Sequence, residues 1–287
     1  MDRKLQLKFN LFFYLFFSFQ AFANLAELES KGFTCRPQNY NNPTSHCVGC
    51  EGEEAGAISC TGMLSSYPDL VTIVFNRKAL KERPENLATF FHGLTNAGTS
   101  VNQDVLNRFN FQKKVEEMKR PFAMVIPHYP SIRSGPKKNT HLHYNHLYSE
   151  QSWTNFQNEF TQLVNPKENA KFHLMGHSGA YRVLARRALD RNTHFESVTL
   201  LDAAYGSSQE LSHWKNRDVK KFNSYYIADS PTAVQNRIIR QNMGPEAVLR
   251  MGKQSRPGDE RITFIELTHR DVNHWTLVDH AFSQFNF

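Results

Sequence analysis

Ser178 lies among small residues in a pattern that could make it a nucleophile. The stretch Gly176-His177-Ser178-Gly179-Ala180 differs by one residue from G-x-S-x-G, because Ala180 stands where the pattern has its last glycine. A serine hydroxyl becomes a good nucleophile when a neighbouring base takes its proton, and a strained turn of small residues leaves that hydroxyl accessible. The alternative is an ordinary turn rich in Gly and Ser, so the pattern alone leaves the role of Ser178 open.

The segments on either side of Ser178 favour the first interpretation. The run "KFHLMG" (171–176) is typical of a buried strand, and "GAYRVLARRAL" (179–189) has the pattern of a helix. A serine in the sharp turn between a strand and the helix that follows is where the G-x-S-x-G motif places its nucleophile. An alanine at position 180 adds only a methyl group to the motif. The sequence therefore predicts Ser178 as a catalytic nucleophile.

The same alternation of strands and helices continues through most of the chain from about residue 66. It predicts an α/β fold in which a mostly parallel central sheet carries helices on both faces. In such sheets the reactive groups gather at the carboxyl ends of the strands. The expected strands are 70–75, 87–91, 122–127, 171–176, 197–202, 222–228 and 262–267, and the expected helices are about 103–119, 152–164, 179–190, 231–243 and 275–285.

Residues 66–287 resemble the α/β-hydrolase superfamily. Besides the turn at Ser178, "FFHGLTNAG" (90–98) is similar to the family's oxyanion loop, in which a strand ends in His-Gly. The resemblance implies that the backbone N–H groups of Leu94 and Gly179 stabilise an oxyanion. It also implies an exported serine hydrolase of the esterase or lipase kind, with no cofactor. An ordinary strand-to-loop turn at this point is the alternative.

The family order of catalytic residues is Ser, acid, His, so the histidine should follow the last strand. Three candidates follow "ITFIEL" (262–267): His269, His274 and His280. His269 is close to the strand end, and His280 falls inside the expected last helix, where packing explains it. His274 lies in a loop from which an imidazole can reach over the edge of the sheet. We therefore expect His274 to be the general base.

Two aspartates compete for the role of the acid. The resemblance favours Asp229, because the family more often places its acid after the later strand. Asp229 also has a simpler explanation, since Asp-Ser-Pro is a common helix start. Asp202 ends the apolar strand "SVTLLD", where a carboxylate needs a partner. We expect Asp202, with Asp229 as the alternative, to complete a Ser-His-Asp triad that works through an acyl-enzyme.

A second constellation, "THLHYNH" (140–146), could hold a metal. His141, His143 and His146 resemble the H-x-H-x-D-H zinc motif of metallo-β-lactamase-like hydrolases. However, polar residues and not a buried strand precede this segment, and Asn145 stands where a second metal would need a carboxylate. We expect no metal and a polar loop near the mouth of the site. A metal-dependent hydrolase and a non-catalytic binding protein on a hydrolase fold are the alternatives.

Residues 1–23 have the features of a secretory signal peptide. Basic residues precede an apolar run around Leu11–Phe19, and Ala21-Phe22-Ala23 matches a cleavage site. An uncleaved anchor is the alternative, but the run is short for a span. The sequence predicts export to the periplasm or the extracellular space, with no stable membrane anchor after cleavage.

The cysteines are confined to the segment that follows. An even number of cysteines in an exported chain predicts two disulfides, with three possible connectivities. A redox C-x-x-C or half of a zinc site at 47–50 is the alternative, but that stretch is polar and has only one close pair. Residues 24–65 are therefore expected to form a small, disulfide-stapled extension before the hydrolase domain at 66–287. The four residues are Cys35, Cys47, Cys50 and Cys60.

The charge balance limits the partners. The 287 residues carry a formal net charge of +7, which falls to about +5 without the three basic residues and one aspartate of 1–23. No dense run of Lys or Arg suggests nucleic-acid binding. The link at 203–221 is too short for a large cap domain. The mild positive charge and a site without a cap domain fit an ester or acyl-bearing substrate that is anionic or polymeric.

Overall fold

The computed structural model describes residues 23–37, 56–93, 106–128, 144–192 and 194–285. They form one ten-stranded sheet with the order β1-β2-β3-β5-β4-β6-β7-β8-β10-β9. The strands are β1 (Thr34–Pro37), β2 (Ile58–Met63), β3 (Leu70–Phe75), β4 (Asn86–Phe91), β5 (Phe122–Pro127), β6 (Lys171–His177), β7 (His194–Leu201), β8 (Asp218–Ile227), β9 (Ala247–Met251) and β10 (Ile262–Leu267).

The sheet is mostly parallel, which confirms the expected fold class. From β5 to β9 every neighbouring pair runs parallel, whereas β1, β2 and β3 are joined to one another and to β5 by antiparallel ladders. All six residues of β4, β5 and β10 are buried. Continuous apolar strands of this kind need cover on both faces, and helices provide it.

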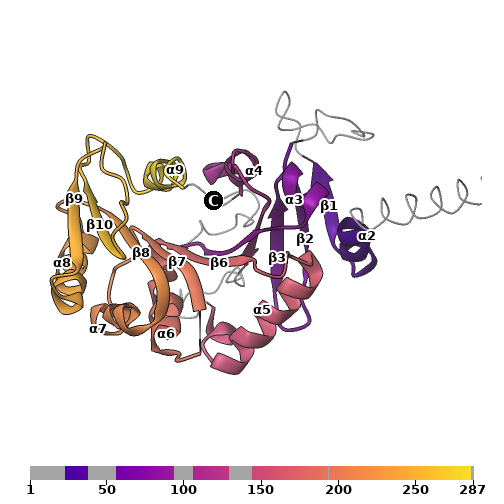
Figure 1. Cartoon of the computed structure of the whole chain (residues 1–287), viewed down its shortest axis with the longest axis horizontal. Helices are drawn as coiled ribbons and strands as arrows, with labels where there is room; N and C mark the ends of the chain where they lie inside the picture. Colours follow the sequence, from indigo (N-terminus) through magenta and orange to yellow (C-terminus); the bar gives the residue numbers. More distant parts are fainter. Residues whose placement is uncertain (1–22, 38–55, 94–105, 129–143, 193, 286–287) are drawn as a thin grey trace, which may run out of the picture.

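Helices pack on both faces of the sheet (Figure 1). In that view α4 and α9 lie above it, and α5 and α6 lie below. Trp153 and Leu184 belong to the core on the lower side, whereas Phe111 and Leu277 belong to the core on the upper side. The helices are α2 (Ala23–Ser30), α3 (Arg77–Glu82), α4 (Phe111–Glu116), α5 (Glu150–Val164), α6 (Tyr181–Leu189), α7 (Ser208–Ser212), α8 (Pro231–Met243) and α9 (Thr276–Phe282).

Some elements differ from the sequence prediction. The expected continuous helix over 103–119 is wrong, because Asn110 has a left-handed backbone (φ 47°) and α4 begins only after it. A left-handed residue cannot continue a right-handed helix. The short edge strand β9 was not predicted, since its half-exposed residues lack a continuous apolar run. Helices α3 and α7 were also missed, and both are too short for a clear periodicity.

The N-terminal segment joins the same sheet. A disulfide links Cys35 to Cys60, which face each other on β1 and β2, and β2 pairs with β3 of the main sheet. Cys47, Cys50 and nearly all of the expected signal peptide lie outside the described residues. Within the described ranges no helix has the length and apolar character needed to cross a membrane.

Buried histidines make the stability of this core dependent on pH. Burial lowers the pKa of His173 and His177, both on β6, to about 3 each. His173 Nε2 donates to Asn86 Oδ1 (3.2 Å), and Nδ1 accepts from Ser197 (2.8 Å), as a neutral ring requires. An unfolded histidine has a pKa of about 6.5, so between about pH 6.5 and pH 3 the unfolded chain binds more protons. The stabilisation is complete above this window and is lost as the pH falls through it.

We expect His173→Gln to make the acid dependence of stability shallower. Removal of one such ring should reduce the slope of the unfolding free energy by about 1.4 kcal/mol per pH unit below pH 6. Urea unfolding from pH 4.5 to 7.5 measures the slope. His269→Gln, which changes an exposed histidine, is the control and should keep the wild-type slope. Equal slopes for wild type and His173→Gln would contradict the assignment.

Candidate active site

Ser178 lies in a strained turn at the carboxyl end of β6. Its φ is 54°, in the left-handed region that residues other than glycine rarely adopt. The backbone passes directly from β6 into a short 3₁₀ turn (Ser178–Ala180) and then into α6. This is the strand–turn–helix placement expected from the sequence, and it leaves the Ser178 side chain partly exposed at the edge of the sheet.

The imperfect match at Ala180 has a structural explanation. A Cβ atom on Gly176 would lie 2.9 Å from the Cβ of Ala180 and 2.4 Å from Cδ1 of Leu184. The two small positions therefore face each other across the turn, and the absence of a side chain at Gly176 provides the space for the methyl of Ala180. An alanine at the last position is compatible with the turn as long as residue 176 is glycine.

Gly93 brings the end of β4 against Ser178. Strand β4 is the neighbour of β6, and a Cβ atom on Gly93 would lie 2.4 Å from Ser178 Cβ, 2.8 Å from Ser178 Oγ and 3.0 Å from the backbone nitrogen of Gly179. Only glycine allows this approach. One of the two expected oxyanion donors, the Gly179 N–H, thus lies where the backbone after β4 meets the turn at Ser178. The other, Leu94, lies outside the described residues.

Tyr144 fixes the end of β4, a role that the sequence analysis missed. Its buried hydroxyl accepts from the His92 N–H (3.0 Å) and donates to the His92 carbonyl (3.1 Å), and its ring packs against Phe91 with centroids 4.7 Å apart. His146 is exposed, whereas His141 and His143 fall in a stretch that the structure does not describe. Among the residues it does describe, no three His, Cys, Asp or Glu side chains gather as metal ligands would.

Asp202 lies directly against His274. Its carboxylate is 2% exposed, and Oδ2 accepts from His274 Nδ1 at 2.6 Å. Oδ1 accepts from the hydroxyl of Thr232, which belongs to the first turn of α8. The buried carboxylate therefore has partners for both oxygens, as a charge in an apolar strand end requires.

The competing candidates lie elsewhere. Asp229 is exposed in the turn before α8, and Ser230 rather than Asp229 caps that helix. His269 is exposed, and His280 lies in α9 with Nε2 2.8 Å from Gln284. Of the candidate acids and bases, the structure brings together Asp202 and His274.

His177 and Asn273 hold the backbone around His274. His177 Nε2 donates to the His274 carbonyl at 2.9 Å, and the two rings lie 4.4 Å apart. The pKa of His177, lowered by burial to about 3, keeps this ring neutral beside the partly exposed imidazole of His274. Asn273 Oδ1 accepts from the N–H groups of Trp275 and Thr276, both at 2.9 Å, and so turns the chain into α9. Asn before a helical run is a start signal that could have indicated this cap.

Tyr205 is a further residue at this site that the sequence analysis did not identify. Its ring lies edge-on to His274 with centroids 6.3 Å apart, and the Ser178 side chain is near enough to influence the pKa of its hydroxyl. The loop that carries it is bounded by Asp202 (φ 47°) and Ser207 (φ 56°), two left-handed residues that reverse the chain after β7. No sequence signal distinguishes Tyr205 from other loop tyrosines, because its position depends on these two turns.

Aromatic side chains and one cation surround the exposed part of the site. Trp275 is 39% exposed and packs against His274 and His177, at 5.0 and 5.5 Å between ring centroids. The Arg108 guanidinium lies 4.2 Å from the centre of the Trp275 ring. A rim of this kind offers apolar surface together with a positive charge for a substrate.

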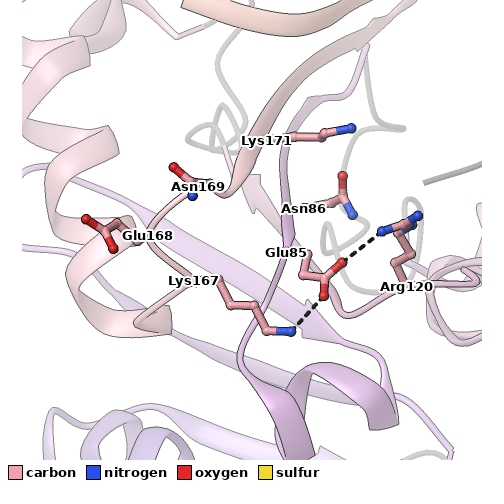
Figure 2. Close-up of a pocket in the computed structure, with 7 residues that line it drawn as sticks. All are labelled: Glu85, Asn86, Arg120, Lys167, Glu168, Asn169 and Lys171. Carbon is pink, nitrogen blue, oxygen red and sulfur yellow. Dashed lines mark hydrogen bonds and ion pairs between the residues drawn. The ribbon is translucent and has the colours of Figure 1, made fainter.

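A separate pocket of about 310 Å³ lies at the amino-terminal ends of the parallel strands (Figure 2), where Asn86 begins β4 and Lys171 begins β6. Three of its charged residues are paired with one another: Glu85 accepts from Lys167 at 2.6 Å and from Arg120 at 3.3 Å. The hydrogen bond from Lys167 holds the pKa of Glu85 below its usual value. Ser178 lies at the other, carboxyl end of β6, so this pocket is not part of the candidate active site.

Comparisons with known proteins agree with this architecture. No protein-family model and no curated protein sequence matches the chain. Among solved structures, an S-formylglutathione hydrolase from Agrobacterium tumefaciens is similar with a TM-score of 0.51 and 12% identity, over 79% of this chain and 93% of that one. A ferulic acid esterase is similar with a TM-score of 0.53 and 11% identity, over 78% and 93%. A thermostable esterase has a TM-score of 0.51 and 12% identity, over 77% and 59%.

At 11–12% sequence identity, the similarity to these structures shows a shared fold. The similar structures cover more than three quarters of this chain. Ser178 lies in the turn between β6 and α6, and strands that are not consecutive in the chain are neighbours in the sheet. Both features agree with the resemblance found in the sequence. The chain therefore has an α/β-hydrolase fold.

Proposed function

We propose that this protein is a serine hydrolase that cleaves an ester bond. Ser178 is the nucleophile, His274 the general base and acid, and Asp202 the carboxylate that orients His274. The observation that carries the proposal is the buried Asp202–His274 hydrogen bond of 2.6 Å at the same sheet edge as the left-handed Ser178. Polar side chains that converge at the carboxyl ends of parallel strands are typical of catalytic sites.

In the first half of the reaction Ser178 Oγ attacks the acyl carbon and His274 Nε2 takes its proton. Asp202 accepts from Nδ1, which fixes the tautomer and stabilises the imidazolium that forms. The negative charge on the acyl oxygen is stabilised by the Gly179 N–H and, by resemblance, by that of Leu94. The tetrahedral intermediate collapses when the bond to the leaving oxygen breaks and His274 gives that oxygen the proton.

The second half repeats these steps with water. His274 takes a proton from the attacking water, the bond between the acyl carbon and Oγ breaks, and Oγ recovers the proton from His274. His177 supports both halves, because its hydrogen bond to the His274 carbonyl holds the backbone of the base in place. No step of this chemistry requires a cofactor.

Substrate class and location are part of the same proposal. Two of the similar structures are a ferulic acid esterase and a thermostable esterase, which supports an ester as the scissile group. The aromatic rim with Arg108 suits a substrate with apolar and anionic parts. The signal-like sequence at 1–23 and the Cys35–Cys60 disulfide support export to an oxidising compartment.

Covalent labelling tests the nucleophile. We expect a fluorophosphonate probe to label wild-type protein at Ser178, and Ser178→Ala to remain unlabelled, because only an activated serine reacts. Ser208→Ala is the matched control: it removes a serine hydroxyl that donates a hydrogen bond to Gln235, and this variant should be labelled to the same extent as wild type. Intact-mass and peptide mass spectrometry identify the labelled residue. An unlabelled wild type, or equal labelling of Ser178→Ala, would overturn the proposal, and activity lost only on chelation would favour a metal site instead.

A further inference from the structure

Tyr205 lies beside the proposed base, close to the proposed nucleophile. It is 42% exposed, its ring lies 6.3 Å from that of His274, and the Ser178 side chain is near enough to influence the pKa of its hydroxyl. An exposed tyrosine beside the proposed nucleophile and the proposed base can reach a substrate that is bound there. The mechanism above leaves this hydroxyl without a role.

The sheet order determines which part of a substrate Tyr205 can reach. Strand β6 lies between β4 and β7, so Gly93 approaches Ser178 from one side and the loop after β7 approaches from the other. The Gly179 N–H faces Gly93, which places the oxyanion on the β4 side. Tyr205 and His274 lie on the β7 side, where the proton must be delivered. The substrate oxygen nearest to Tyr205 is therefore the leaving oxygen, not the carbonyl oxygen.

The hydroxyl has the chemistry for this position. Burial and the charge of Asp202 raise the pKa of Tyr205 to about 12, so it stays protonated at neutral pH and can donate a hydrogen bond. An alkoxide leaving group is a strong base and needs such a donor as the bond breaks.

We propose that Tyr205 is a further catalytic residue, which donates a hydrogen bond to the oxygen that leaves the tetrahedral intermediate. This inference rests on the proposed serine-hydrolase function. When the bond between carbon and the leaving oxygen breaks, the electron pair goes to that oxygen and the proton comes from His274. Tyr205 keeps its own proton and stabilises the developing charge. In the second half, the attacking water occupies the same place and is held by the same hydroxyl, as microscopic reversibility requires.

Two esters of the same acyl group distinguish this role from a structural one. Nitrophenolate leaves without help, whereas ethoxide needs a donor. For Tyr205→Phe we expect kcat/KM on ethyl butyrate to fall about 10- to 100-fold, the effect of one hydrogen bond to a charged group. On p-nitrophenyl butyrate we expect a change of no more than about threefold, since kcat/KM reports only the first half of the reaction. Thermal unfolding shows whether the variant is folded.

Tyr181→Phe is the matched control. Tyr181 packs beside Gly206 of the same loop, but its hydroxyl accepts from Arg182 Nε (3.0 Å), so its loss should change neither ester by more than about threefold. An equal loss on both esters for Tyr205→Phe, or none on either, would overturn the role of Tyr205, as would a wild type that cleaves only the nitrophenyl ester. A wild type that cleaves neither ester and is not labelled at Ser178 would overturn the proposed function itself.

Discussion

Asp202→Asn is expected to lower kcat by about 10³- to 10⁴-fold. The Asp202 carboxylate accepts from His274 Nδ1 at 2.6 Å and is buried, so no water can replace its charge. An asparagine can accept through its carbonyl oxygen, but it cannot stabilise the imidazolium, and its NH₂ group can favour the wrong tautomer of His274. Steady-state hydrolysis of p-nitrophenyl butyrate measures the effect.

Asp229→Asn is the matched control for this prediction. Asp229 ends the neighbouring strand and also has a left-handed backbone (φ 60°), but it is exposed, and Ser230 supplies the helix cap. We expect kcat within about twofold of wild type, as for other surface substitutions away from the site. If Asp229→Asn caused the large loss and Asp202→Asn the small one, the acid would be Asp229 and the pairing with His274 would not be catalytic.

Gly93→Ala is expected to lower kcat/KM by at least about 100-fold while the protein stays folded. The added Cβ would lie 2.4 Å from Ser178 Cβ and 3.0 Å from the Gly179 nitrogen, so either the nucleophile turn or the end of β4 must move. The Tyr144 hydroxyl holds the chain after β4 in place, because it hydrogen-bonds both the backbone N–H and the carbonyl of His92. The turn at Ser178 is therefore the part that shifts. Displacement of a nucleophile by about 1 Å costs about this much in rate.

Gly206→Ala, in the loop after β7, is the control for this prediction. A Cβ atom there would meet Tyr181 at 3.4 Å, an ordinary contact, so activity should stay within about threefold of wild type. Fluorophosphonate labelling rates and circular dichroism for both variants separate a displaced nucleophile from an unfolded chain. A Gly93→Ala protein that is folded and labels at the wild-type rate would show that the close approach at Ser178 has no catalytic importance.

Local pattern was sufficient for much of the fold. The runs predicted as strands at 70–75, 122–127 and 262–267 are β3, β5 and β10 with the same bounds, because a short and nearly continuous apolar run is stabilised by burial on both faces of a sheet. The prediction failed where the backbone departs from its pattern. Asn110 breaks the expected helix at 103–119 through a left-handed conformation that its neighbours do not indicate.

The candidate site depended far more on tertiary structure. Tyr205 and Tyr144 are ordinary loop residues in the sequence, and both acquire their contacts only after chain reversals at left-handed residues: Ser207 and Asp202 for Tyr205, and Tyr144 itself. Thr232 reaches Asp202 because α8 begins beside the end of β7. Contacts of this kind join loops that are 30 or more residues apart, and no spacing in the chain encodes them.

By itself, the sequence determined the strand, turn and helix around Ser178, the small residues that the turn requires, and the mostly parallel sheet. These features follow from hydrophobic periodicity and from the steric demands of one backbone segment, both of which are local. The tertiary structure decided which aspartate lies against His274, that Gly93 rather than a side chain touches Ser178, and that Tyr205 lies beside His274. The physical reason is the strand order β4-β6-β7-β8-β10, which brings the carboxyl ends of strands far apart in the chain to one edge, where left-handed turns then set the direction of each loop.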